Sequence, residues 1–253
     1  MKKGLKVKNI KKQFNGIWVV NGITAIIHPG KITAFVGPNG AGKTTLFHII
    51  TGELKPDSGN VFLYEKDITG FPPWKIARMG VGKQFQDVRV FENLTVVENV
   101  VVALMKSQEE SVFWTFKNFY RIRERFKNYT EKAMDLLKFV GLDEKRNSLA
   151  RELSFGQQKL LSFARLMAGD FKILLMDEPT AGVAPSMIKK IVGLLDKLVE
   201  EKGKTIAIIE HNLNVVSDVA HWVYFLHEGK VVFTGRTDHV LGHDEVREIY
   251  MGF

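Results

Sequence analysis

The sequence contains no cysteine, which excludes disulfide bonds and metal sites built from thiolates. It also lacks any apolar run long enough to cross a bilayer as a helix. The N-terminal stretch MKKGLKVKNI carries charge without an apolar segment behind it, so we expect no secretory signal. Internal repeats and low-complexity linkers are missing as well. The lack of cysteine also fits a reducing compartment.

The 253 residues are 45% apolar and 25% charged, which is ordinary for a globular chain of one or two domains. The formal net charge is +8, and part of it is concentrated near the start, where six lysines and no acid fall within residues 1–12. Lysine alternates there with Leu5 and Val7. This pattern favours a solvated edge strand, because lysines discourage edge-to-edge pairing.

Short apolar segments alternate with helical ones along most of the chain. Alternation around Leu5, Val7 and 23–27 predicts antiparallel strands, with turns at Asn15-Gly16 and Pro29-Gly30. Strands are also predicted at KITAFVG, VFLYEKDI, ILLM, TIAIIE, HWVYFLHEGK and VVFTG. Helices are predicted at TTLFHIITG, QQKLLSFARLMAG and MIKKIVGLLDKLVEEKG. The order predicts an α/β fold with a parallel-sheet core and an antiparallel β subdomain.

One section of the chain interrupts this alternation. From about residue 72 to about 149 the pattern is mostly helical and rich in aromatic residues. We interpret this section as a helical subdomain inserted into the core, which residues 1–71 and about 150–253 form. The whole of 1–253 is therefore predicted to be a single domain.

The stretch GPNGAGKTT has the composition of a loop that holds phosphates. Gly37, Gly42, Lys43 and Thr44 belong to the pattern G-x-x-x-x-G-K-[ST], and a strand precedes the loop while a helix follows it. The backbone N–H groups and the helix N-terminus bind phosphate oxygens, and the lysine adds a positive charge. The predicted nucleotide-binding residues are Gly37, Pro38, Asn39, Gly40, Ala41, Gly42, Lys43, Thr44 and Thr45.

Such a loop needs a further ligand for the Mg²⁺ that accompanies a nucleoside triphosphate. In ILLMDE, four apolar residues are followed by Asp177 and Glu178 at the end of a predicted strand. Open α/β sheets place ligands at this end of their strands. We expect Asp177 and the Thr44 hydroxyl to hold Mg²⁺, and Glu178 to polarise the attacking water.

The segment LSFGQQ, residues 153–158, extends this set of motifs. Together with the phosphate loop, DEP and His211, it resembles the ATP-binding cassette ATPases of transporters, and the resemblance covers essentially the whole chain. The resemblance implies a cassette nucleotide-binding fold, the substrate ATP, the cofactor Mg²⁺ and the hydrolysis of ATP. It also implies that two ATPase subunits pair and that ATP is bound between them.

The family pattern assigns roles to particular residues. The resemblance implies that Phe14 stacks on adenine, and that Gln86 senses Mg²⁺ and the γ-phosphate and acts in catalysis. It makes Glu178 the general base and His211 a ligand of the γ-phosphate and the water, while Lys43 contributes to catalysis. The signature residues, which would contact ATP on the opposite subunit, are Ser154, Gly156 and Gln157.

Two positions depart from the common family pattern. Phe155 stands in the signature where a smaller residue is usual, which resembles the branch that serves branched-chain amino acid importers. Ala184 stands where many members have an aspartate that contacts the partner subunit. This departure favours a heterodimer, in which a different ATPase chain has the complete loop, over a homodimer.

Other stretches resemble the larger ATPase subunit of branched-chain amino acid importers, among them GFPPWKIARMGVGKQFQ, IIEHNLNVVSDVA and REIYMG. The implied protein is peripheral, at the cytoplasmic face of the inner membrane, and works with integral membrane permease subunits. An ATPase of lipopolysaccharide export stays open as an alternative. A weaker alternative is a soluble cassette that acts on nucleic acid or ribosomes, which the basic and aromatic 113–129 segment would favour. We expect no nucleic-acid partner.

Overall fold

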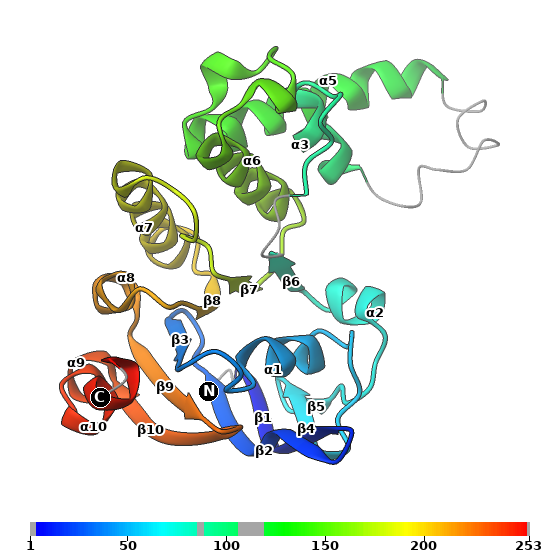
Figure 1. Cartoon of the computed structure of the whole chain (residues 1–253). Coiled ribbons are helices and arrows are strands. Elements are labelled where there is room, and N and C mark those ends of the chain that lie inside the picture. The colour runs from blue at the N-terminus through cyan, green and yellow to red at the C-terminus, as the bar shows by residue number, and fades with distance from the viewer. Residues whose placement is uncertain (1–3, 85–88, 106–118, 252–253) are drawn as a thin grey trace. The chain divides into compact units, whose positions relative to one another are not determined.

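The computed structural model describes residues 4–84, 89–105 and 119–251 of the chain (Figure 1). Contacts divide the chain into two compact units. Unit 1 comprises Met1–Gln86, Phe171–Ala181 and Ile188–Phe253, and unit 2 comprises Asp87–Asp170 and Gly182–Met187. Unit 1 contains both β-sheets, whereas unit 2 is helical.

The first sheet of unit 1 has four antiparallel strands in the order β2-β1-β4-β5. They are β1 (Leu5–Phe14), β2 (Ile17–Ile27), β4 (Ser58–Leu63) and β5 (Lys66–Asp67). The prediction that the lysine-rich strand lies at an edge is wrong, because β1 pairs with β2 on one side and β4 on the other. Its lysines alternate with buried Leu5 and Val7 and so occupy the solvent face of the strand, not an edge of the sheet.

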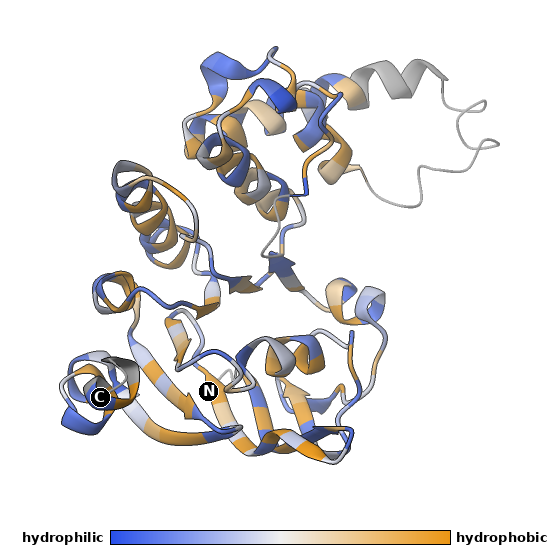
Figure 2. Ribbon diagram, in the orientation of Figure 1, coloured by the Kyte–Doolittle hydropathy of each residue, from blue (hydrophilic) through white to orange (hydrophobic). Residues whose placement is uncertain are grey.

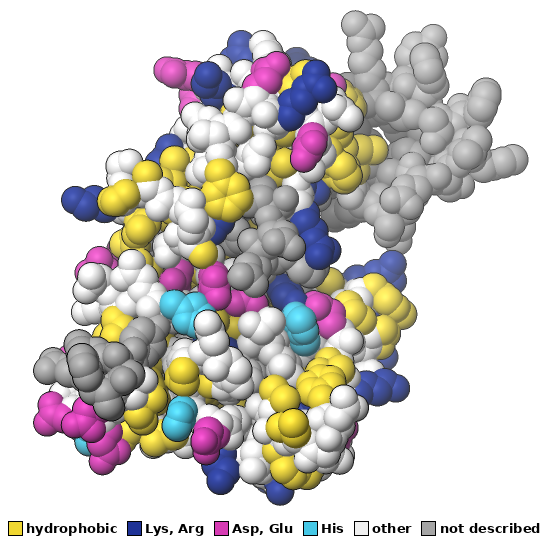
Figure 3. Space-filling model, in the orientation of Figure 1, with side chains coloured by type: hydrophobic (Ala, Val, Ile, Leu, Met, Phe, Trp, Pro, Cys, Tyr) yellow, Lys and Arg dark blue, Asp and Glu magenta, His cyan; other side chains and the backbone are white. Residues whose placement is uncertain are grey.

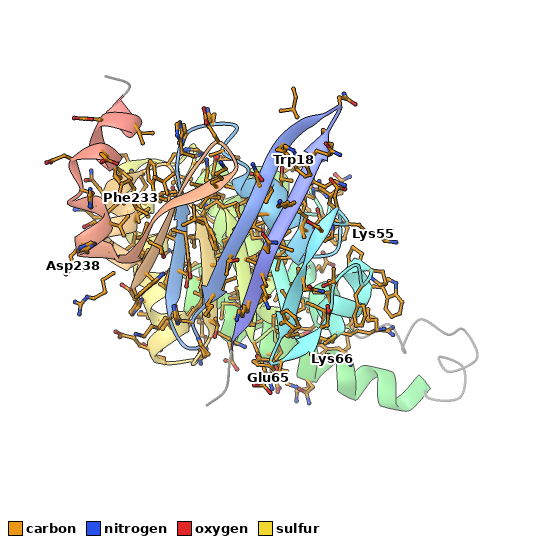
Figure 4. All side chains as sticks on the ribbon, turned by 90° about the horizontal axis from the view of Figure 1, so that it is seen from below. Trp18, Lys55, Glu65, Lys66, Phe233 and Asp238 are labelled. Atoms are coloured by element: carbon orange, nitrogen blue, oxygen red, sulfur yellow. The ribbon has the colours of Figure 1, made fainter. Side chains whose placement is uncertain are left out.

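A second difference concerns VFLYEKDI, which was expected to be one strand. It forms two, because Tyr64 and Glu65 both adopt positive φ (49° and 80°) and turn the chain between β4 and β5. Figure 4 shows Glu65 and Lys66 together at this turn, toward one end of the sheet, with Trp18 of β2 toward the other end. The predicted turn at Asn15-Gly16 is confirmed, with φ of 50° and 83°.

The second sheet has six strands in the order β10-β9-β3-β8-β7-β6. Its members are β3 (Ile32–Val36), β6 (Val81–Gln84), β7 (Ile173–Asp177), β8 (Thr205–Ile209), β9 (Trp222–His227) and β10 (Lys230–Arg236). All neighbours are parallel except β9 and β10. The carboxyl ends of β3, β8 and β7 consequently lie side by side, and the predicted site residues follow directly after these strand ends.

Helices complete unit 1 around these sheets. They are α1 (Lys43–Ile50), α2 (Pro73–Arg78), most of α7 (Pro185–Glu200), α8 (Leu213–Val219), α9 (Thr237–Leu241) and α10 (Asp244–Met251). Figure 2 shows the apolar residues along the strands, and a continuous buried cluster joins the two sheets to α1 through residues such as Phe35, Phe47 and Tyr224. Tyr224 stacks on Phe35 with ring centroids 5.3 Å apart. This packing fixes the phosphate loop between β3 and α1.

Unit 2 is built from α3 (Val96–Leu104), α5 (Phe119–Val140) and α6 (Phe155–Ala168), which pack against one another, and the short 3₁₀ helices η2 (Asp143–Lys145) and η3 (Ala150–Glu152). Capping boxes begin two of its helices. Thr95 and Glu98 cap α3, and Ser154 and Gln157 cap α6. Among the helices of the described ranges, none has the length and apolar character that crossing a bilayer requires.

The boundaries of the helical unit differ from the predicted ones. It begins at Asp87 and not at about residue 72, because β6 pairs with β7 in the large sheet and so belongs to unit 1. It extends to Asp170 and not to about 149, because α6 packs on α3 and α5. Residues 106–118 lie outside the described ranges, as do the side chains of 119–125, so most of the aromatic segment 113–129 does too.

Candidate nucleotide site

The phosphate loop lies between β3 and α1 and requires glycine at two close approaches. Gly37 has φ of 144°, and a Cβ there would come within 2.0 Å of the Leu226 carbonyl oxygen. Gly42 has φ of 90°, and a Cβ there would lie 2.3 Å from the Val19 carbonyl oxygen. Any larger residue would displace the loop, so the glycines of the motif are explained by space as well as by conformation.

Lys43 stands at the start of α1 and points back into the loop. Its ammonium group donates hydrogen bonds of 2.8 Å to the carbonyl oxygens of Gly37 and Pro38. Burial lowers the pKa of Lys43, and the charges of Glu178 and Asp177 oppose this shift. No acidic residue lies in the first turn of α1. Both the lysine and the free helix N-terminus therefore favour a bound anion.

A pocket opens over this loop within unit 1. It has a volume of about 160 Å³, and its walls come from the loop, from β2 and from the ends of the parallel strands. The lining residues are Val19, Asn39, Gly40, Gly42, Lys43, Thr44, Thr45, Glu178 and His211. Lys43, Thr44, Glu178 and His211, all predicted site residues, therefore line one cavity.

Asp177 ends β7 and is only 4% exposed. Burial raises its pKa above the ordinary value, and so does the charge of Glu178, while a hydrogen bond from Thr44 acts in the opposite direction. Its Oδ1 atom is buried and has no hydrogen-bond partner within the described part of the chain. A carboxylate with an unused oxygen beside a hydroxyl is an oxygen donor set of the kind that Mg²⁺ takes with the phosphates of a nucleotide. The residues present fit the ion.

Glu178 follows Asp177 and faces His211. The His211 Nε2 atom lies 3.0 Å from the Glu178 Oε1 atom, and both side chains are partly exposed. Glu178 has φ of 50°, in the left-handed region that non-glycine residues rarely adopt. An ionisable pair in a pocket, on a strained backbone, is typical of a catalytic site.

Sequence reasoning missed two residues next to this pair, Glu210 and Thr180, which are hydrogen-bonded to each other. Glu210 is buried, and its carboxylate accepts hydrogen bonds from Thr180 and from the backbone N–H of His211. The only signal in the sequence is an acid before His211 and a threonine two residues after Glu178. These contacts depend on the adjacency of β7 and β8, which the local pattern does not reveal.

Phe14 lies at the end of β1, opposite Ile17, in the hairpin with β2. It is 45% exposed, and the Lys12 ammonium lies 5.7 Å from its ring centroid. Val19, on the same strand as Ile17, lines the phosphate pocket. An exposed aromatic ring on this hairpin is available for stacking on a base.

The signature residues belong to unit 2. Ser154 caps α6, and its hydroxyl accepts from the Gln157 N–H, so both lie in the exposed first turn of that helix. Two glycine contacts join this turn to the 182–187 segment. A Cβ on Gly182 would meet the Phe155 ring at 3.1 Å, and a Cβ on Gly156 would meet Met187 at 3.0 Å.

These contacts give the departure at Phe155 a structural reason. The ring covers the bare backbone of Gly182, two residues before Ala184, so the signature turn and this loop form one packed piece within unit 2. Gln86, by contrast, lies outside the described residues.

Comparison with known proteins decides the family. The model of the family described as "ABC transporter" matches residues 20–181, which is more than half of the chain. The chain belongs to the ABC transporter ATPase family. Members of this family hydrolyse ATP, and the α/β fold with a helical unit agrees with that of cassettes of known structure.

Two relatives of this cassette cover nearly its whole length. A protein of Escherichia coli K12 named "High-affinity branched-chain amino acid transport ATP-binding protein LivG" is 33% identical, over 98% of this chain and 97% of its own. A protein of Archaeoglobus fulgidus named "Probable branched-chain amino acid transport ATP-binding protein LivG" is 36% identical, over 98% and 95%.

Two solved cassettes are similar in structure. One, described as the ADP conformation of an ATP-binding cassette of an ABC transporter, has a TM-score of 0.85 at 32% identity and covers all of both chains. Another, described as a dimeric post-hydrolysis state bound to ADP and Pi, has a TM-score of 0.74 at 26% identity and covers 92% of this chain and 98% of its own.

Proposed function

We propose that this cassette hydrolyses ATP to power the import of branched-chain amino acids through integral membrane permease subunits. Full-length similarity to proteins named for that transport is the observation that carries the proposal. The pocket over the phosphate loop, with Glu178 and His211 in its wall, supplies the chemistry. The cassette would lie at the cytoplasmic face of the membrane as a peripheral subunit.

Each residue of the site has a separate role in the proposed hydrolysis of ATP. The loop N–H groups and Lys43 bind the phosphates of ATP, and Phe14 stacks on adenine. Asp177 and Thr44 hold Mg²⁺, which when bound neutralises charge on the phosphates. Glu178 accepts the proton of the attacking water. The water oxygen bonds to the γ-phosphorus, the bond to the bridging oxygen breaks, and the products are ADP and inorganic phosphate.

His211 complements the base in this scheme. Its position 3.0 Å from Glu178 allows one imidazole to orient both the carboxylate and the γ-phosphate. Gln86, which lies outside the described residues, is assigned the role that the family resemblance implies, which is to sense Mg²⁺ and the γ-phosphate. The signature residues Ser154, Gly156 and Gln157 contact ATP held by a second ATPase subunit. A related cassette described as dimeric supports the pairing of two subunits.

Ala184 makes a heterodimer the favoured arrangement. If the partner is a different chain, the purified cassette should self-associate weakly with ATP, even as Glu178→Gln. Ala184→Asp should then strengthen self-association modestly. Analytical ultracentrifugation with and without ATP measures this, and a tight wild-type homodimer at low micromolar concentration would contradict the heteromeric partner.

A surface on unit 2 is suited to the permease. Phe91 is 47% exposed, while the buried amide of Asn99 holds its backbone with bonds of 2.8 Å to its N–H and 3.0 Å to its carbonyl. The Arg165 guanidinium lies 4.6 Å from the Phe91 ring and donates to the Arg89 carbonyl. An exposed aromatic on a fixed backbone, with Arg89 and Glu92 exposed beside it, matches an anchor with a charged rim.

Reconstitution tests both the function and this surface. The cassette with its permease subunits and partner ATPase should take up labelled leucine in an ATP-dependent manner. Charge reversal at Arg89 or Glu92 should leave the ATPase activity of the isolated cassette within a factor of about two, as for surface sites remote from the chemistry. Uptake and stimulated hydrolysis should both fall. Full uptake from both variants would exclude these side chains from coupling.

The rival functions lead to different outcomes of the same purification. Co-purification with lipopolysaccharide-export subunits would favour that alternative, and co-purified nucleic acid or ribosomes would favour the soluble class. Figure 3 shows basic and acidic side chains interspersed among the described residues of one face.

A further inference from the structure

Glu210 is a buried carboxylate that the hydrolysis scheme leaves unused. It is 2% exposed and directly follows β8. Its Oε1 atom accepts hydrogen bonds of 3.0 Å from the Thr180 N–H and 2.7 Å from the Thr180 hydroxyl, and its Oε2 atom accepts one of 3.2 Å from the His211 N–H. A buried carboxylate is costly without partners, and these three donors compensate its burial.

The three hydrogen bonds join two separate segments of the site. Thr180 belongs to the segment after β7, and His211 to the segment after β8. The two strands are neighbours, with Asp177 opposite Ile209. Glu210 therefore links the backbone that carries Glu178 to the backbone that carries His211.

The backbone at Glu178 needs such a link. Its φ of 50° is unusual for a residue with a side chain, and conformations of this kind persist where the surrounding contacts fix them. The Glu178 N–H donates to the Ile209 carbonyl at 2.9 Å, and the Glu178 carbonyl accepts from Ala181 at 3.2 Å. Glu210 holds Thr180, the residue between these two contacts in the chain, by both its N–H and its hydroxyl.

We propose that Glu210 is a positioning residue for ATP hydrolysis, which through Thr180 and the His211 backbone keeps the Glu178 carboxylate and the His211 imidazole in contact. Glu210 touches no reacting atom. The inference rests on the proposed roles of Glu178 and His211 in the same site.

Three variants remove or restore individual hydrogen bonds. Glu210→Gln keeps the shape of the side chain but replaces one accepting oxygen with an NH₂ group, which cannot accept the hydrogen bond of an N–H donor. Thr180→Val removes only the hydroxyl, and Thr180→Ser restores it. The measurements are kcat for ATP hydrolysis, the Kd for ATP and the melting temperature, all on the full chain. Thr237→Val is the matched control, because it too removes a buried threonine hydroxyl that donates a hydrogen bond, in this case to the Ala220 carbonyl oxygen.

We expect Glu210→Gln and Thr180→Val to lower kcat by roughly 10- to 100-fold, as for a misplaced catalytic group, with the Kd for ATP nearly unchanged. Thr180→Ser should recover most of the activity. The double variant Glu210→Gln/Thr180→Val should lower kcat little more than Glu210→Gln alone, because the two side chains act through the same hydrogen bonds. The control should change the melting temperature without changing kcat.

Glu178→Gln separates failure of this inference from failure of the proposed function. If Glu178→Gln stops hydrolysis while Glu210→Gln and Thr180→Val turn over normally, Glu210 has no positioning role. If Glu178→Gln itself turns over normally, the assignment of the base is wrong, and the positioning role is excluded with it. A loss of kcat in Thr180→Val that Thr180→Ser does not recover would also overturn the proposal.

Discussion

The two units of the cassette present their functional residues in different ways. In unit 1, Lys43, Asp177, Glu178 and His211 stand at the ends of buried strands or at the start of a helix packed on them, and hydrogen bonds hold most of them in place. In unit 2, the signature lies on the exposed first turn of α6, and Ser154, Phe155, Gly156 and Gln157 contain no titratable group.

This difference indicates that the two units have different roles, catalysis in unit 1 and phosphate binding by the signature of unit 2. Unit 1 has the groups to which we assign proton transfer and Mg²⁺ binding, and contacts hold them in place, as catalysis with a fixed geometry requires. The unit 2 signature offers a hydroxyl, an amide and backbone N–H groups, which can bind an anion but cannot act as a base at neutral pH. We infer that unit 1 performs hydrolysis and that the signature completes a site by contact with phosphate.

The largest expected effect comes from the base in unit 1. Glu178→Gln removes the proton acceptor but keeps the shape, so hydrolysis should slow by about 10²–10⁴-fold while the Kd for ATP is kept. The variant should accumulate in an ATP-bound dimer with its partner subunit. Steady-state phosphate release and equilibrium nucleotide binding measure the two quantities. Near-normal turnover would remove Glu178 from the mechanism.

A smaller effect is expected from the packing within unit 2. Phe155→Ala removes the ring that covers Gly182, so hydrolysis should fall by about 10-fold, as when a contact that orients a site is loosened. ATP binding to the isolated chain should not change. Phe155→Tyr should retain activity. Phe126→Ala is the matched control, because Phe126 is a phenylalanine of the same unit with similar exposure, 51% against 48%. An equal loss in the control would mean that the effect is not specific to the signature.

The smallest effect concerns stability. Burial raises the pKa of Asp177, so its charged form is disfavoured in the folded protein without metal. Asp177→Asn should therefore stabilise the metal-free protein at neutral pH while abolishing hydrolysis. Chemical denaturation measures the free energy of unfolding, and a destabilised variant would contradict the account.

Asp57→Asn serves as the control of opposite sign. Hydrogen bonds from Lys12 and Gln13 lower the pKa of the exposed Asp57 from its ordinary value of 3.8. The charged carboxylate therefore stabilises the fold at pH values above 3.8, and this contribution is lost as the pH falls through the lowered pKa. The variant should be slightly less stable at neutral pH and indistinguishable from the wild type in strong acid. Thermal melts at both pH values measure the difference.

The sequence predicted the parts of unit 1 that depend on local pattern. The phosphate loop, the strand-end acids Asp177 and Glu178, and the strands around them follow from residue types at fixed spacing. The link from Glu210 to Thr180 was not predicted, because it arises from the pairing of strands whose residues are about 30 positions apart. The interior place of β1 was missed for the same reason, since alternation shows which face of a strand is buried but not how many neighbours the strand has.

In unit 2 the sequence predicted helices but not their boundaries or contacts. The signature turn was found by its motif, and its capping box by Ser154 and Gln157 agrees with the pattern of a helix start. The packing of Phe155 on Gly182 could not be predicted, because an exposed aromatic in a motif gives no sign of its partner.

The central claim is that the signature acts on ATP bound to another subunit. Ser154→Arg and Glu178→Gln, each inactive alone, should restore hydrolysis when mixed at concentrations high enough to overcome the weak self-association of the purified cassette, so that the wild type turns over as a homodimer. The mixed dimer then has one site with both an intact base and an intact signature. Random pairing predicts about one quarter of wild-type activity, since half of the dimers would carry one working site of two. No recovery on mixing, with each variant still binding ATP and with pairs of the two variants detected by analytical ultracentrifugation, would contradict the claim and place the signature's action within its own chain.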